Sequence, residues 1–154
     1  MTETQRIQDQ FHRARHGQAW HGPSLYELLA DVTPAQAAAH PLADSHSIWE
    51  LVNHLAAWES IALRRLQGES VRAIADGMNF PPVSDKSEPA WQTAQALLAV
   101  SESAVRAFVD GLTDERLDET VTGKAWTIYL ELHGLIQHAI YHAGQIALLK
   151  KTLP

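Results

Sequence analysis

Apolar positions recur at helical spacing along most of the chain. Four segments show this pattern: Glu3–Arg15, Ser47–Gly68, Trp91–Val109 and Thr127–Leu149. Ala, Leu, Gln and Glu dominate these segments and favour helices, and no segment shows the strict apolar–polar alternation of a half-buried strand. The pattern therefore predicts four long helices and no sheet.

Residues that cap or break helices mark the ends of these segments. Ser47 and Glu50 have the spacing of a capping box, in which each side chain satisfies a backbone N–H at the start of a helix. Pro23 suits the first position of a short second helix that runs to about Val32, and Thr33 caps another short turn. Three glycines are natural helix ends: Gly17, Gly68 and Gly111.

The chain between Gly68 and Pro89 lacks helical periodicity and is rich in Gly, Pro, Ser and Asp. It predicts a long irregular connection, and connections of this length in a compact domain are often functional. Helices joined by loops without strands pack as bundles. We therefore expect an all-α fold, an antiparallel four-helix bundle with short extra helical turns, formed by a single domain over residues 1–154.

Length, charge and cysteine content narrow the class of protein. A chain of 154 residues with 45% apolar and 19% charged residues is typical of one globular domain. Its 12 Lys and Arg against 18 Asp and Glu, a formal net charge of -6, argue against a nucleic-acid partner, which needs clustered basic residues. The absence of Cys excludes disulfides, thiolate nucleophiles and Cys-ligated metals, and it fits a reducing compartment.

One segment, Leu132–Leu149, carries no Asp, Glu, Lys or Arg and has to be weighed as a membrane span. Five strongly polar side chains make its insertion into a bilayer unfavourable: His133, Gln137, His138, His142 and Gln145. A buried helix whose polar groups have partners inside the protein is the better interpretation. Because the N-terminus also lacks the apolar run of a signal peptide, we expect a cytoplasmic protein with no membrane partner.

Nine histidines supply the candidate chemistry, and four of them form two pairs at i, i+4 spacing. This spacing places both rings of a pair on one helix face, within reach of a single ion. His138 and His142 lie in the uncharged segment, where unpartnered imidazoles would cost about 1–3 kcal/mol each. His12 and His16 lie among arginines near a helix end, where exposed imidazoles are favourable. We expect a shared partner, either a metal ion or a carboxylate or water, only for the first pair.

A third ligand would have to come from another helix, and His54 is the best candidate. It borders the apolar stripe of the Ser47–Gly68 segment, and the alternative for it is a hydrogen bond to a backbone carbonyl. Three neutral imidazoles leave coordination positions open, which is the pattern of a catalytic rather than a structural metal site. Nitrogen ligands without thiolate suit Zn, Ni, Co or Fe.

Three stretches carry a resemblance to a known family. They are Trp20-His21-Gly22-Pro23-Ser24-Leu25, then Ser47-Ile48-Trp49-Glu50-Leu51-Val52-Asn53-His54 followed by Ala57-Trp58-Glu59, and finally His138-Ala139-Ile140-Tyr141-His142-Ala143-Gly144-Gln145-Ile146. Together they make the chain, over nearly its whole length, similar to the DinB-like family. The last stretch, H-x-x-x-H-x-G-Q-I, is the most specific of them.

This resemblance implies a four-helix bundle, often dimeric, with one divalent metal held by one His of the second long helix and the His pair of the last. Carried over residue by residue, the ligands are His54, His138 and His142, with Zn or Ni the expected ion. The family includes metal-dependent hydrolases and enzymes that activate a low-molecular-weight thiol, such as mycothiol-dependent maleylpyruvate isomerase and bacillithiol transferases. The chain carries no motif that defines a substrate.

Two residues beside the expected ligands are candidates for supporting roles. Glu50 lies one helical turn before His54 and either orients that ring or acts as a base, or serves only in the capping box. Gln145 lies one turn after His142 and either hydrogen-bonds a ligand ring or a bound substrate, or packs between helices. No catalytic residue is assigned, and Glu50 and Gln145 are the candidates.

Other aromatic and histidine side chains are expected to be structural. Tyr141 and Trp58 are predicted to be core or interface aromatics. His133 is about 140° around the last helix from the His pair and should face away from it. Trp20 and His21 precede the restarted helix, where they are expected to serve packing and entry geometry.

Two functions are compatible with these observations. The first is an enzyme, a metal-dependent hydrolase or a thiol-dependent transferase of a small molecule, in which the ion lowers the pKa of a bound water or thiol. The second is a non-catalytic dimeric helical binding protein with a structural or vestigial metal site. Apolar residues outside the main stripes, among them Trp91 and Phe108, are expected to remain for a second copy of the chain in a homodimer.

Overall fold

Four long helices make up most of the structure, a computed structural model that describes residues 1–153 with the side chain of Asp76 excepted. They are α1 (Glu3–His16), α4 (Ile48–Leu66), α6 (Glu88–Asp110) and α7 (Ile128–Thr152). Short elements occupy the connections: α2 (Leu25–Leu29), α3 (Pro34–Ala37), α5 (Asp76–Asn79) and the 3₁₀ turn η1 (Asp114–Asp118). Over the described residues there is no strand beyond one isolated bridge between Thr120 and Thr127, so the expected all-α bundle is confirmed.

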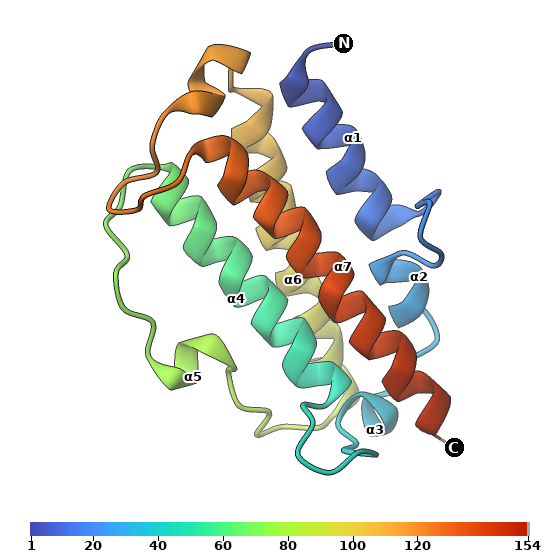
Figure 1. Ribbon diagram of the computed structural model, residues 1–154. Helices are drawn as coiled ribbons and strands as arrows, with labels where there is room; N and C mark the ends of the chain where they lie inside the picture. Colours follow the sequence, from blue (N-terminus) through green and yellow to red (C-terminus); the bar gives the residue numbers. More distant parts are fainter. Residues whose placement is uncertain (154) are drawn as a thin grey trace.

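The long helices run two in each direction (Figure 1). Helix α4 runs antiparallel to α7. His54 faces His138, whereas Arg65, farther along α4, lies near Glu131 at the start of α7. With α6, α4 is parallel, since the ring of Trp49 meets that of Trp91 near the beginning of both helices. Parallel neighbours need a crossover the length of the bundle, and this is what the long connection after α4 provides.

The predicted capping box of α4 is present. The Ser47 hydroxyl accepts a bond from the Glu50 backbone N–H, and the Glu50 carboxylate accepts one from the Ser47 N–H. Two predicted starts are wrong. The short helix α2 begins at Leu25 rather than at Pro23, because Ser24 caps it and Glu27 closes a capping box with Ser24. Likewise α6 begins at Glu88 rather than Trp91: Ser87 caps it, and its proline occupies the first turn, where a missing N–H costs nothing.

Buried apolar side chains form two clusters, one toward each end of the bundle. Polar residues separate them. Glu59 of α4 lies between the two clusters, and so do Ser101 and Glu102 of α6. Arg15 lies at the end of the apolar stripe of α1. The guanidinium of Arg15 is fully buried and pairs with Glu59, whose second carboxylate oxygen accepts a 2.5 Å hydrogen bond from Ser101. The core is thus divided by a charged layer.

Several surface expectations are wrong. Trp91 is 1% exposed, and its indole N–H bonds to the Val32 carbonyl, so this ring is core and not left for a partner. Phe108 is half-buried and packs on the second apolar cluster. Conversely Trp20 is fully exposed at 101%, and His21 is also exposed, so neither serves helix packing. None of the described helices has the length and hydropathy of a bilayer-spanning segment.

Candidate metal centre

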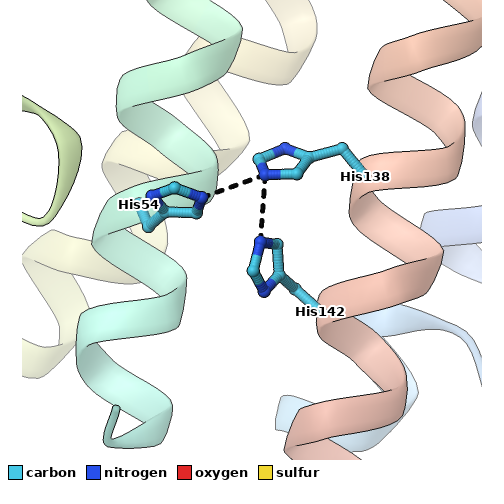
Figure 2. Close-up of side chains that lie close together, drawn as sticks. All are labelled: His54, His138 and His142. Carbon is cyan, nitrogen blue, oxygen red and sulfur yellow. Dashed lines mark hydrogen bonds between the residues drawn. The ribbon is translucent and has the colours of Figure 1, made fainter. Parts of the chain in front are cut away.

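Three imidazoles project into the space between α4 and α7. His54 comes from α4, while His138 and His142 come from successive turns of α7 (Figure 2). The Nε2 atom of His138 lies 3.0 Å from Nε2 of His54 and 2.9 Å from Nε2 of His142. One ligand atom of each ring lies within 4.8 Å of those of the other two. The fold therefore brings together the three residues that the sequence indicates as ligands.

The far side of two of these rings is held by an oxygen acceptor. The carbonyl of Asn79 lies 2.7 Å from His54 Nδ1, and the side-chain oxygen of Gln145 lies 2.5 Å from His142 Nδ1. Because these oxygens only accept, each ring carries its proton on Nδ1 and donates it outward. The Nε2 lone pairs of His54 and His142 are therefore directed at the centre, the arrangement by which outer hydrogen bonds orient metal-ligating histidines.

Hydrogen bonding among the three rings alone cannot satisfy this geometry. If His138 carries its proton on Nε2, that proton can reach only one of the two facing lone pairs, and if it does not, three lone pairs converge. A cation satisfies all three. An ion with nitrogen ligands at about 2.0–2.1 Å sets nitrogen separations of about 3 Å between ligands, close to the two shortest separations here. The residues fit a divalent transition-metal ion.

The electrostatics keep the rings neutral, which is the form that ligates. Burial lowers the pKa of His138 to about 3, and the neighbouring imidazoles of His142 and His54 add to the effect. Burial also lowers the pKa of His54 and of His142, against the opposing bonds to Asn79 and Gln145. Each of the three rings is therefore in its neutral form, with a single N–H, at neutral pH.

The connection after α4 covers one side of the centre. The ring of Phe80 stacks on His54 at 4.0 Å between centroids and on His46 at 3.7 Å on its other face. The side-chain oxygen of Asn79 accepts a 2.8 Å bond from the indole of Trp58, so the segment is held to α4 at two points. The predicted long connection is therefore irregular for most of its length, but its short helix α5 ends against His54.

The candidate supporting residues differ in where they lie. Gln145 bonds a ligand ring, one of the two alternatives for it. Glu50 makes its contacts elsewhere: it caps α4, bonds His40 at 3.1 Å and lies 3.5 Å from His46. Among the described contacts of Glu50 none reaches the three imidazoles, so the capping role accounts for it.

The other singled-out side chains lie outside the triad. His12 and His16 are exposed on α1, although His16 also bonds the buried carboxylate of Glu102 at 2.6 Å. The ring of His133 lies tilted beside that of Tyr129 on its own helix, 4.3 Å between centroids, and none of its described ring contacts is with the three imidazoles. Neither aromatic expected in a core or interface is fully buried: Tyr141 is 64% exposed beside His142, and Trp58 lies half-buried beside His54 and His138.

Comparison with known proteins places the chain in a family. The profile of the DinB superfamily matches residues 19–146, a stretch that contains all three imidazoles. The chain belongs to the DinB superfamily. A search of curated proteins finds no match.

One similar solved structure is described as a conserved protein of a locus from Enterococcus faecalis. The two sequences are 20% identical, and the structures superpose with a TM-score of 0.74. The match covers 99% of this DinB chain and 97% of the Enterococcus faecalis chain. At that identity the likeness concerns the fold alone. The DinB match begins after α1 and leaves that whole helix outside its range, although Arg15 of α1 is buried against Glu59.

Proposed function

We propose that this DinB protein is a metal-dependent enzyme, a hydrolase or a thiol-dependent transferase, with one divalent ion held by His54, His138 and His142. The convergence of three Nε2 atoms, two of them oriented by outer hydrogen bonds, is the observation that supports it best. When bound, such an ion acts as a Lewis acid that lowers the pKa of a water molecule or thiol.

The residues of the chain define what the rest of the site contributes. The outer bonds of His54 and His142 fix two ligand tautomers, and the stacked Phe80 shields one side of the centre from water. His138 lies in the wall of a surface pocket, which supplies an open side for a substrate. A thiol nucleophile has to come from outside, because the chain has no Cys. Zn or Ni is the expected ion, and the cytoplasm the expected compartment.

Metal binding is the first test. Calorimetric titration of the untagged protein with Zn²⁺ or Ni²⁺ should show one ion bound per chain, and His142→Ala should abolish it. An ion that binds only the folded state stabilises it, by about 2.7 kcal/mol at a hundredfold excess over Kd, so the melting temperature should rise for the wild type alone.

His12→Ala is the matched control, because it removes an exposed imidazole of another i, i+4 pair. It should keep the full metal response. With the metal loaded, turnover of a model ester without thiol favours the hydrolase, and turnover only with an added thiol favours the transferase. A wild-type chain that takes up no ion, or a His142→Ala variant that still does, would contradict the proposal and favour a non-catalytic binding protein.

A further inference from the structure

A pocket of about 610 Å³ opens beside the metal centre. Its walls come from the second half of α4, the first half of α7, and the two loop segments that flank these halves. His138 forms part of the wall, so a molecule in the pocket contacts the region of the three imidazoles. The pocket residues that carry charge or aromatic surface are Trp58, Arg65, Arg72, Lys124, Trp126 and Glu131.

Positive charge gathers in this pocket. Arg65, Arg72 and Lys124 face a single carboxylate, Glu131, whereas the whole chain has a formal net charge of -6. A concave surface lined by one sign of charge concentrates ligands of the opposite sign. Another hollow near the centre, of about 320 Å³ beside Gln145, is lined by Asp44 and by no Lys or Arg. The cationic lining is therefore specific to the side that His138 faces.

Arg65 has spare hydrogen-bonding capacity inside this pocket. Its side chain is 6% exposed, and its Nη1 atom lies 3.5 Å from the carboxylate of Glu131, which also accepts a bond from the indole of Trp126. Within the described part of the chain its buried Nε–H has no acceptor. A buried donor of a charged group without an acceptor is unfavourable, and a ligand oxyanion would supply that acceptor.

The remaining walls are apolar and aromatic. The ring of Trp58 lies under the guanidinium of Arg65 at 5.5 Å, and the ring of Trp126 lies under the Lys124 ammonium at 5.2 Å. Each cation is thus paired with an aromatic face that can also contact a flat or aliphatic ligand body. Ligand sites combine such apolar walls with a few placed polar groups.

We infer that this pocket is the substrate site and that it takes a small molecule with an oxyanion group, a carboxylate or a phosphate, on an apolar body. The oxyanion binds Arg65 with Arg72 and Lys124, and the body lies between the two indoles. The inference rests on the proposed function only for the reaction that follows, because binding itself uses residues outside the metal triad.

Titration calorimetry on metal-free protein tests it, with benzoate, phenyl phosphate, benzamide and benzylamine as probes. Benzoate and phenyl phosphate should bind, each at least about tenfold more tightly than neutral benzamide, as expected for one charge-assisted hydrogen bond. Cationic benzylamine should bind most weakly. Binding of only one of the two anions would identify the oxyanion and still support the pocket. The inference would be overturned if neither benzoate nor phenyl phosphate binds more tightly than benzamide.

Variants connect the binding to the pocket. Arg65→Lys keeps the charge but loses the Nε donor and should weaken benzoate binding about tenfold. The double variant Arg72→Gln with Lys124→Gln leaves the buried pair of Arg65 and Glu131 unchanged. It should weaken benzoate binding by a similar factor. Arg64→Gln, an exposed neighbour on α4 that pairs with Glu69, is the matched control and should bind as the wild type does. Equal weakening in Arg64→Gln and in the double variant would contradict a specific pocket.

The two proposals fail separately. Zn²⁺ uptake without any preference for the anionic probes rejects this pocket and leaves the metal-dependent function standing. Preference for benzoate in a chain that takes up no Zn²⁺ or Ni²⁺ supports the pocket and rejects the metal-dependent function.

Discussion

At the scale of single residues, the candidate site depends on where each imidazole carries its proton. His54 and His142 donate from Nδ1 to oxygen acceptors, while burial keeps His138 neutral with a pKa of about 3. In the unfolded chain the same rings take up a proton near pH ~6.5. Between these values the unfolded state binds more protons, so the free energy of unfolding falls as the pH falls.

This difference predicts an acid-sensitive fold in the metal-free protein. Between about pH 7.5 and pH 5.5, His138 alone should lower the free energy of unfolding by about 1 kcal/mol, allowing for solvent screening at this partly exposed ring. Urea titrations at both pH values measure it. His138→Gln should lose that part of the pH dependence, and His12→Gln, at an exposed site, should not. An unchanged pH dependence in His138→Gln would show that the ring is not held neutral.

The sequence indicates the three imidazoles in two ways: the i, i+4 spacing marks His138 and His142 as a pair, and the family resemblance adds His54. Asn79 and Phe80 could not be predicted from it. Asn79 bonds the ring of His54 through its backbone carbonyl, which every residue has, and Phe80 reaches the same ring only through the path of an irregular connection. The role of Arg65 was hidden for a related reason: a basic residue at the end of a helix usually complements the helix dipole on the surface.

At the scale of helices, one ion pair joins α1 to α4 inside the core. Both Arg15 and Glu59 are about 1% exposed, and Nη2 lies 2.5 Å from the carboxylate. Burial raises the pKa of Glu59, and the Arg15 charge and the Ser101 hydroxyl oppose that rise. Removing one partner leaves the other charge buried without compensation, which is costlier than removing both.

Glu59→Gln should therefore destabilise the protein by about 3 kcal/mol, measured by urea unfolding. The double variant Arg15→Met with Glu59→Leu should destabilise the protein less than either substitution alone, because neither charge of the pair remains buried without its partner. Glu69→Gln breaks an exposed pair with Arg64 and should change the stability by less than about 1 kcal/mol. A double variant as unstable as the sum of its parts would argue against this account.

Element boundaries followed the sequence where a cap was unambiguous and departed from it where proline was involved. Ser47 with Glu50 predicted the start of α4 correctly, because both halves of the capping box can be seen in the sequence. The composition around Pro89 predicts a loop, although Ser87 before it caps the helix and makes a proline in the first turn acceptable. The direction of α6 relative to α4 depends on a crossover, and periodicity carries no information about direction.

At the scale of the whole molecule, one helix carries exposed apolar side chains beside a groove. Leu97 and Val100 on α6 are 57% and 65% exposed and border a groove between α4 and α6 that is lined by small side chains, among them Ala56 and Ala57. Protruding side chains beside a groove on the same face can be self-complementary across a twofold axis. A second copy of this chain is the partner we expect there.

Light scattering at micromolar concentration should give twice the chain mass of 17.1 kDa. Leu97→Glu with Val100→Glu should produce the monomer, because charges at the centre of an apolar contact are unpaired when buried. Leu148→Glu introduces the same charge at a 56% exposed site on α7 and should leave the dimer intact. A wild-type mass of 17.1 kDa would contradict the prediction.

The charged layer between the two apolar clusters also has a geometric consequence. An α-helix advances about 5.4 Å per turn, so a slip of α4 by one turn would move Glu59 from Arg15 to the level of aliphatic side chains. Apolar contacts alone tolerate such sliding better than an ion pair does, since they lack direction. His54 lies on the same helix, five residues before Glu59, and is carried along by any slip. The ion pair thus fixes the position of α4 along the bundle axis relative to α1, and with it the level at which His54 enters the space facing α7.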